Sequence, residues 1–208
     1  MIEAVIFDMD GVLIDAKEWH YAALNRALRL FGVEISLADH LTTFDGLPTR
    51  RKLELLSVTE RFPLALHGFV NELKQAYTME IVGARCKPTF THEYALSSLK
   101  RRGLKLAVAS NSVRNSVTAM MDRSGLDQYL DLMLSNEDVA LAKPDPEIYI
   151  AAMTRLGVSP ERTLIVEDND HGVRAARASG AHVMVVRGVE DVNLLAIDAR
   201  IAEIEASA

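Results

Sequence analysis

The sequence predicts an α/β fold in which a doubly wound parallel sheet is interrupted by a helical insertion. Short apolar runs rich in β-branched residues recur along the chain, and helix-like stretches alternate with them. The runs are apolar on both faces, which is typical of buried strands in a parallel sheet. One long interval after the first run has helical patterning and no convincing strand, so it is read as an insertion.

The predicted strands and helices follow in order from these patterns. The strands are 4–7, 104–109, 163–166 and 182–186, with a weaker one at 130–134. The helices around them are 91–102, 112–123, 146–156 and 169–179. A glycine lies just past the end of each helical stretch, where a helix C-cap favours it: Gly103, Gly125, Gly157 and Gly180.

The interval from 15 to 82 is predicted to form a separate helical unit. Its first helix carries one apolar stripe at helical spacing: Trp19, Ala23, Leu24, Ala27, Leu28 and Phe31. Pro48 suits the first turn of a further helix at 48–56, after a turn at Asp45 and Gly46. The tail, 189–208, is predicted to be one more amphipathic helix. The domains are therefore a core of 1–14 with 83–208 and a helical domain of 15–82.

Composition and net charge limit the kinds of molecule that the protein is expected to bind. The 208 residues are 49% hydrophobic and 25% charged, as in ordinary globular proteins, and the net charge is −6. A net negative charge gives no long-range attraction for nucleic acid or an anionic membrane, so an anionic substrate must be held by local cations. The single cysteine, Cys86, excludes an intrachain disulfide.

The start of the sequence and its apolar runs predict a location. The first residues lack the basic start of a signal peptide, and no apolar run approaches the ~20 residues of a membrane span. We therefore expect a cytoplasmic protein without membrane or nucleic-acid partners, present as a monomer or weak homodimer.

Chemistry is expected at the carboxyl ends of the strands, where open parallel sheets bind ligands. The polar residues found there are Asp8 and Asp10, Ser110 and Asn111, and Glu167 and Asp168, with Lys143 in a separate loop. The side chains of Asp8 and Asp10 leave an extended segment on the same side. With Asp168 they form an oxygen-rich site that suits Mg²⁺.

These residues supply the parts that phosphoryl transfer requires. Asp8 is the predicted nucleophile, and Asp10 is the acid that protonates the leaving oxygen and later activates water. Lys143 and the Ser110 hydroxyl are predicted to hold the phosphate. Each assignment has a competing structural interpretation. The three acids could be helix-capping or turn residues, and Lys143 could be a solvated loop lysine. Ser110 could cap the next helix.

Four ordered motifs resemble those of the haloacid dehalogenase superfamily, in its β-phosphoglucomutase-like branch of phosphatases and mutases. The motifs are Asp8-Met9-Asp10-Gly11-Val12, Ser110-Asn111, Lys143-Pro144 and Glu167-Asp168, and the resemblance covers 2–186. The resemblance implies a Rossmann-like core, with Mg²⁺ held by the Asp8 carboxylate, the Asp10 backbone carbonyl and Asp168. It places Glu167 at the metal rim through water, and it implies that 15–82 is a cap that closes over the core and selects the substrate.

Residues in the predicted cap are weaker candidates for substrate binding. His20 is either a half-buried histidine or a residue that couples cap closure to Asp10. The loop at Gly46 resembles a substrate-facing loop, and Arg50 is its candidate contact, with Arg51 or no contact as alternatives. Lys74 is expected on a solvated helix face. Asn111 is also a substrate-binding candidate, through its backbone more than its side chain.

The predicted function is a Mg²⁺-dependent phosphatase that acts on a small phosphorylated metabolite, by default a sugar or polyol phosphate. The alternative within the family is a phosphosugar mutase, in which Arg50 and Arg114 would hold a second phosphate. Two features count against the mutase. Neither arginine has quite the spacing of the mutase pattern, and Ala16 stands where a small hydroxyl residue is common in mutases. A dehalogenase would not need the metal arrangement. A third alternative is an inactive regulator that binds a phosphorylated ligand.

Overall fold

The computed structural model describes residues 1–44 and 46–207. All five predicted strands are present and form one parallel sheet in the order β3-β2-β1-β4-β5. The strands are β1 (Ala4–Phe7), β2 (Lys105–Ala109), β3 (Leu132–Leu134), β4 (Thr163–Glu167) and β5 (His182–Val185). Because the strand order reverses direction at the central β1, the doubly wound α/β fold is confirmed.

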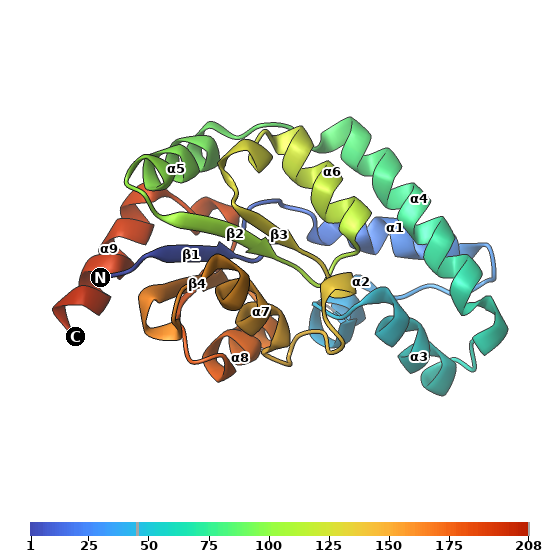
Figure 1. Ribbon diagram of the computed structural model, residues 1–208. Coiled ribbons are helices and arrows are strands. Elements are labelled where there is room, and N and C mark those ends of the chain that lie inside the picture. Colours follow the sequence, from blue (N-terminus) through green and yellow to red (C-terminus); the bar gives the residue numbers. More distant parts are fainter. Residues whose placement is uncertain (45, 208) are drawn as a thin grey trace.

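Helices cover both faces of this sheet (Figure 1). One face carries α5 (Phe90–Arg101), α6 (Arg114–Ser124) and α9 (Leu194–Ala206), and the other carries α7 (Glu147–Leu156) and α8 (Asp170–Ala178). Successive residues of β1 divide between the two cores, since Val5 and Phe7 pack on the first face and Ala4 and Ile6 on the second. Both faces are therefore buried, as the wholly apolar strands predict.

The helical insertion lies between β1 and α5 and extends from one end of the sheet (Figure 1). It contains α1 (Lys17–Arg29), α2 (Leu37–Asp39), a π-helical turn (His40–Phe44), α3 (Thr49–Thr59) and α4 (His67–Arg85). These helices enclose a hydrophobic cluster of their own, to which Leu24, Leu53 and Val70 contribute. The predicted stripe of α1 is divided, because Trp19 packs against the core of the sheet and Phe31 against the helical cluster.

Several predicted helix boundaries are shifted in the structure. The helix expected at 48–56 runs from Thr49 to Thr59, with Pro48 at its N-cap, and Asp45 lies outside the described residues. Asn169 caps α8 through its side chain, as expected for a residue that starts that helix. The four predicted C-cap glycines all have positive φ. Short 3₁₀ turns occupy Leu64–Leu66, Asp127–Tyr129, Asn136–Asp138, Pro160–Arg162 and Val189–Asp191.

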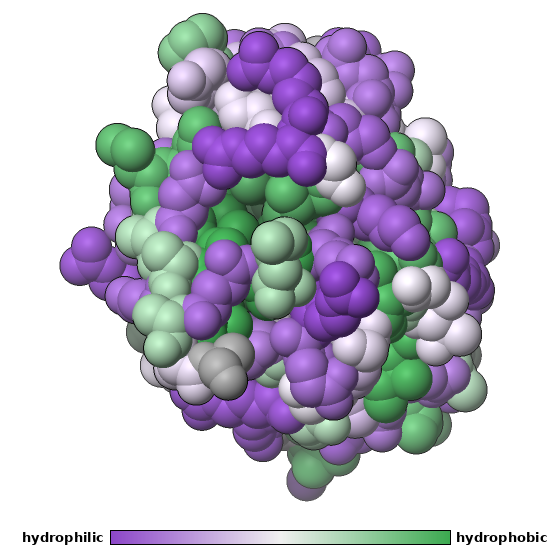
Figure 2. Space-filling model, turned by 60° about the vertical axis from the view of Figure 1, so that its left-hand side comes forward, coloured by the Kyte–Doolittle hydropathy of each residue, from purple (hydrophilic) through white to green (hydrophobic). Residues whose placement is uncertain are grey.

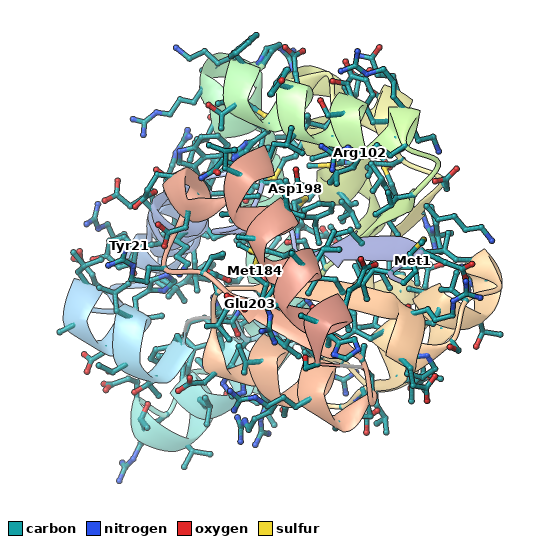
Figure 3. The ribbon with its side chains drawn as sticks, turned by 90° about the vertical axis from the view of Figure 1, so that its left-hand side faces the viewer. Met1, Tyr21, Arg102, Met184, Asp198 and Glu203 are labelled. Atoms are coloured by element: carbon teal, nitrogen blue, oxygen red, sulfur yellow. The ribbon has the colours of Figure 1, made fainter. Side chains whose placement is uncertain are left out.

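The tail folds back onto the first face of the sheet. Its helix begins later than predicted, at Leu194, because Asn193 caps it after a 3₁₀ turn. Ile197 and Ile204 are buried in the core beneath it. Arg102, at the end of α5, donates two hydrogen bonds of 2.5 and 3.0 Å to Asp198 on α9. Figure 3 labels these two residues on their neighbouring helices. The tail is thus a packing element.

Hydrophilic side chains cover most of the face seen in Figure 2, with apolar side chains between them in smaller groups. Along residues 1–44 and 46–207, no helix combines the length and the apolar character needed to cross a bilayer.

Candidate active site

The carboxyl ends of the central strands bring the predicted acids together. Asp8 follows β1, and Glu167 and Asp168 stand at the end of β4, the strand that pairs with β1 in parallel register. The backbone N–H of Asp8 donates to the carbonyl of Val166 at 3.0 Å, which fixes one segment against the other. This is where the strand order changes direction, and open α/β sheets bind ligands at that place.

Lys143 joins two of these acids by ion pairs inside the protein. Its Nζ lies 2.7 Å from Asp8 Oδ1 and 2.7 Å from Glu167 Oε1, and all three residues are buried. Burial lowers the pKa of the Lys143 ammonium, but the two carboxylates outweigh it, so its pKa is raised. Lys143 is therefore a fixed positive charge beside the predicted nucleophile, and the competing interpretation as a solvated loop lysine is wrong.

Glu167 has no exposed surface and accepts four hydrogen bonds. Besides Lys143, its donors are the Tyr149 hydroxyl at 2.5 Å, the backbone N–H of Asp168 at 3.1 Å and the Asn169 amide at 3.4 Å. Burial, and then the nearby negative charge of Glu167, raise the pKa of Tyr149 well above its ordinary value, so the phenol stays a donor. Sequence reasoning missed Tyr149, although a hydroxyl on the buried face of α7 was the available signal.

Asp168 is held by a lysine from the helical insertion. Lys17 Nζ lies 2.6 Å from Asp168 Oδ2, an oxygen without exposed surface. Gly11 passes close to the same oxygen, since a Cβ at this position would lie 2.1 Å from it, and its φ of +87° is a left-handed conformation that glycine adopts without strain. The Asp8–Gly11 segment can therefore pass Asp168 only with glycine at position 11.

Three acids form a group with the geometry of a metal site. Asp8, Glu167 and Asp168 each present a carboxylate oxygen within 4.8 Å of the others. Burial raises the pKa of both Asp8 and Asp168, and the charges of Lys143 and Lys17 oppose this shift only in part. A divalent cation would relieve the remaining repulsion, so the donor set fits Mg²⁺, which prefers carboxylate oxygens. The Asp10 carboxylate is not in this group.

Asp10 faces the helical insertion instead. Its Oδ1 lies 3.0 Å from His20 Nε2, and its Oδ2 accepts a hydrogen bond from the Ser112 hydroxyl at 2.8 Å. Burial alone would raise the pKa of Asp10, but His20 and then Ser112 lower it below the ordinary value. The structure therefore holds Asp10 as a carboxylate, in the form of a base.

A second buried lysine extends this chain of contacts. Lys74 Nζ lies 3.1 Å from His20 Nδ1. An ammonium only donates, so Nδ1 accepts and the ring proton is on Nε2, where it is donated to Asp10. Burial, followed by the charge of Lys74, lowers the pKa of His20, which agrees with a neutral ring. The expectation that Lys74 lies on a solvated face is wrong, because α4 packs it against α1 with 7% of its surface exposed.

Asn111 connects three segments through its side chain. Its amide donates to the carbonyls of Gly46 at 3.0 Å and Lys143 at 3.2 Å, and its Oδ1 accepts from the Lys143 N–H at 3.0 Å. These contacts give the side chain a structural role, and binding of substrate by Asn111 stays a prediction. Asn111 fixes the loop of Lys143 and the insertion loop at Gly46 against the end of β2.

The Ser110 hydroxyl accepts from the N–H of Ser112 at 3.0 Å, and Ser110 is buried at the end of β2. The next helix begins only at Arg114, with no side-chain cap, so Ser110 shapes a turn and does not cap α6. Ser110 lines the pocket, and its hydroxyl can donate a hydrogen bond to a group bound there.

One pocket unites residues from the sheet and the insertion. The predicted site residues on its walls are Asp8, Asp10, His20, Gly46, Arg50, Ser110, Asn111 and Lys143. Sequence reasoning missed further lining residues, among them Lys17, Lys52 and Ser112, because their positions depend on how the helices dock.

The two arginines considered for substrate binding both form ion pairs within the protein. Arg50 is largely exposed and pairs with Glu54 at 3.2 Å. Arg114 pairs with Asp138 at 3.2 Å and is not among the described lining residues.

Replacement of Gly172 by alanine is expected to destabilise the protein, although alanine favours helices. A Cβ at Gly172 in α8 would lie 1.8 Å from Glu167 Oε1. We expect Gly172→Ala to lower the free energy of unfolding by about 1–3 kcal/mol and to reduce activity, because Glu167 must move. Gly83→Ala in α4 is the matched control: its Cβ would meet nothing closer than 4.0 Å, so a gain of about 0.5–1 kcal/mol is expected. Equal gains in thermal melts of both variants would contradict this packing.

Comparisons with known proteins agree with this geometry. The family model described as "Haloacid dehalogenase-like hydrolase" matches residues 5–186. A phosphorylated carbohydrates phosphatase of Thermotoga maritima is 33% identical over 182 residues, covering 86% of this chain and 82% of the relative. A phosphoglycolate phosphatase of Aquifex aeolicus is 30% identical over 179 residues, with the same coverage. The solved β-phosphoglucomutase of Clostridium difficile has a TM-score of 0.86 at 21% identity, covering 99% of this chain and 100% of that structure.

Buried carboxylates and the buried Lys143 meet at the switch point of a doubly wound sheet. The chain belongs to the haloacid dehalogenase-like hydrolase family, as its four motifs predict. The predicted enzyme class, a phosphoric monoester hydrolase, agrees with the phosphatases among its relatives. The solved structure, at its low identity, supports the fold.

Proposed function

We propose that the chain is a Mg²⁺-dependent phosphatase of small phosphorylated metabolites, sugar or polyol phosphates first, with Asp8 as its nucleophile. The observation that carries the proposal is the arrangement around Asp8, whose buried carboxylate is held by Lys143 at 2.7 Å and lies beside Glu167 and Asp168. The relatives that act on phosphorylated carbohydrates and phosphoglycolate support the substrate class.

The proposed metal ligands are the Asp8 and Asp168 carboxylates with the Asp10 backbone carbonyl. Bound Mg²⁺ would neutralise charge on the phosphoryl oxygens. Glu167 belongs to the same acidic group, but Lys143, Tyr149, the Asp168 N–H and the Asn169 side-chain amide already donate to its oxygens. We therefore assign Glu167 mainly to the orientation of Lys143.

Asp8 would attack phosphorus and become an aspartyl-phosphate, while the leaving oxygen takes a proton from Asp10. Lys143 and the Ser110 hydroxyl would hold the phosphoryl oxygens. Asp10 is ionised in this structure, and a phosphate dianion beside it would raise its pKa by repulsion and let it carry the proton. In the second half of the reaction, Asp10 in its basic form would take a proton from the attacking water.

The helical domain of 15–82 is proposed to be a cap that closes over this site. Support comes from contacts between its residues and the core, at Lys17 with Asp168, His20 with Asp10 and Gly46 with Asn111. Such closure would exclude bulk water from the phosphoryl group. A cytoplasmic location and a monomeric or weakly dimeric state stay predictions.

A phosphosugar mutase is the second candidate, and phosphorus NMR separates the two. The protein would be incubated with Mg²⁺ and a panel of sugar phosphates, including β-glucose 1-phosphate with a trace of glucose 1,6-bisphosphate. Growth of inorganic phosphate is the expected result. Conversion of one ester into another without phosphate release would make the chain a mutase, and Mg²⁺-dependent binding without any reaction would indicate an inactive regulator.

The pH profile is expected to fall as pH rises through about 8. Burial and the charge of Lys52 lower the pKa of Lys74 from 10.5 to about 8, against the opposing charge of Asp10. Above that pH, Lys74 loses the positive charge that it presents to His20 and the pocket, so kcat/KM for an anionic substrate should decline. Steady-state rates between pH 6 and 10 measure this effect.

Lys74→Arg is the control, because arginine keeps its charge over this range. Its profile should lack the decline near pH 8, even if its maximum is lower. Unfolding does not explain the decline. Between about pH 8 and 10.5, Lys74 binds more protons in the unfolded chain than in the folded protein. Its contribution to the free energy of unfolding therefore increases as pH rises. A decline unchanged in Lys74→Arg would remove Lys74 as its cause.

A further inference from the structure

Tyr149 places a hydroxyl within the hydrophobic core on the second face of the sheet. It is among the largest fully buried side chains, and Ile6 and Ile165 belong to the same cluster. Phenylalanine would fill nearly the same space without a polar atom, and a buried hydroxyl destabilises a protein unless it is hydrogen-bonded. This hydroxyl donates to Glu167 Oε1 at 2.5 Å. The contact with Glu167 is therefore what a tyrosine adds at this position.

The same oxygen of Glu167 accepts a hydrogen bond from Lys143. The Lys143 Nζ lies 2.7 Å from Oε1, and it also lies 4.7 Å from the centroid of the Tyr149 ring. At such a distance an ammonium group is attracted by the face of an aromatic ring. Tyr149 thus acts on Lys143 in two ways, directly through its ring and indirectly through the hydroxyl that it donates to Glu167.

The backbone and the ammonium group of Lys143 are held by different parts of the protein. The side chain of Asn111 bonds to the backbone N–H and the carbonyl of Lys143, at 3.0 and 3.2 Å. A long, flexible side chain separates this backbone from Nζ, so these bonds do not determine where the charge lies. The position of Nζ depends instead on Asp8, Glu167 and the Tyr149 ring.

The two carboxylates that hold Nζ would behave differently in the proposed reaction. Asp8 would lose its negative charge when its oxygen bonds to phosphorus, so its attraction for Lys143 would weaken. Glu167 would keep its charge and draw Nζ away from the reacting oxygens. The Tyr149 hydroxyl shares Oε1 with Lys143. It therefore competes with Nζ for that oxygen and restrains the carboxylate from turning toward the ammonium.

We propose that Tyr149 is a positioning residue for phosphoryl transfer, which keeps Lys143 Nζ beside Asp8 while the phosphoryl group is transferred. It acts by donating to Glu167, and it is not among the described residues that line the pocket. This inference rests on the proposed phosphatase function and deepens it, because it makes the rate depend on a hydroxyl that does not touch the substrate.

Tyr149→Phe tests the hydroxyl alone, because the variant keeps the ring against Lys143. With Mg²⁺ and p-nitrophenyl phosphate, kcat should fall about tenfold or more, the usual effect of losing a hydrogen bond to a charged group. KM should change less than about twofold, because the charge that attracts the substrate is still present. Tyr129→Phe is the matched control, since Tyr129 packs against the first face of the sheet, and it should keep wild-type kcat. An unchanged kcat in Tyr149→Phe would overturn the proposal.

Lys143→Met separates positioning from packing. If Tyr149 acts through Lys143, adding Tyr149→Phe to Lys143→Met should lower kcat by less than about twofold further, because the group to be positioned is gone. A further loss of about tenfold in the double variant would contradict the proposal, because Tyr149 would then act on the fold or on another group.

Crystal structures test the same contact without any activity. Asp8→Asn removes the charge that phosphorylation would remove, and in this variant Nζ should stay within hydrogen-bond distance of the side-chain oxygen at position 8. When Tyr149→Phe is added, Nζ should move beyond about 3.5 Å from that oxygen and remain on Glu167. An Nζ with the same position in both proteins would overturn the proposal, whatever the rates are. If the wild-type protein releases phosphate from no substrate, the proposed phosphatase function fails, and the position of Nζ still decides this inference.

Discussion

Asp8→Asn should reduce phosphatase turnover by more than about 10⁴-fold, because it removes the proposed nucleophile and the proposed covalent intermediate with it. The fold should survive the change. Asparagine has nearly the same shape, its amide oxygen still accepts from Lys143, and Lys143 keeps its ion pair with Glu167 at 2.7 Å. Steady-state phosphate release and a thermal melt, measured on the same preparation, separate lost chemistry from lost structure.

A neighbouring acid provides the control for this variant. Asp15 is exposed and lies outside the pocket residues described above, so Asp15→Asn should retain wild-type rates. Substantial turnover in Asp8→Asn would remove the nucleophile assignment. A melting temperature far below that of Asp15→Asn would instead show that Asp8 is needed for folding.

Asp10→Ala should lower kcat by about 10²–10⁴-fold, the usual range for a general acid or base. The variant should still allow slow phosphorylation of Asp8, most readily with a substrate whose leaving group needs no proton, such as p-nitrophenyl phosphate. Hydrolysis of the phosphorylated protein should be slower still, because water then lacks its base. Rapid mixing should therefore show a burst of p-nitrophenol followed by a slow steady state.

Ser112→Ala tests how much of this effect depends on the hydrogen bonds around Asp10. It removes the 2.8 Å bond to Oδ2 and leaves His20 on Oδ1. A loss of about 10- to 100-fold at most is expected, since a hydrogen bond to a charged group contributes about 1.5–3 kcal/mol and the carboxylate stays in place. Normal steady-state rates in Asp10→Ala would remove Asp10 from acid–base catalysis.

The sheet could be predicted from the sequence because its central strands, β1 and β4, are buried on both faces and read as apolar runs. Even the short β3 was anticipated, although only Leu134 among its three residues is fully buried. Helix ends were less predictable. The tail helix was expected from 189, but α9 begins five residues later, at Leu194, because the side-chain cap of Asn193 and a 3₁₀ turn compete with helix extension there.

The core of the site was predictable for the same reason that the sheet was. Asp8, Ser110 and Asp168 follow strands that end at one edge, so their proximity follows from topology alone. The pairing of Lys143 with both Asp8 and Glu167 depends on a loop, and a sequence motif located the lysine without revealing its second partner.

Residues contributed by docked helices could not be placed in this way. Lys74 and Lys52 look like ordinary solvated lysines of amphipathic helices in the sequence. The structure buries both at the pocket, and it brings Lys74 to 3.1 Å from His20. Tyr149 likewise reads as a core aromatic until its hydroxyl is found on Glu167. Hydrophobic periodicity and composition indicate which face of a helix is buried. They do not indicate which buried groups of the rest of the protein that face contacts.

The central claim is that a phosphoryl group passes through Asp8, and reductive trapping tests it most directly. Asp10→Ala protein would be mixed with Mg²⁺ and p-nitrophenyl phosphate, treated with borohydride, which reduces an aspartyl-phosphate to homoserine, and digested for mass spectrometry. We predict homoserine at position 8, and none there when phosphate ester is omitted. Turnover under these conditions with Asp8 unmodified, or with the label on another residue, would contradict the account.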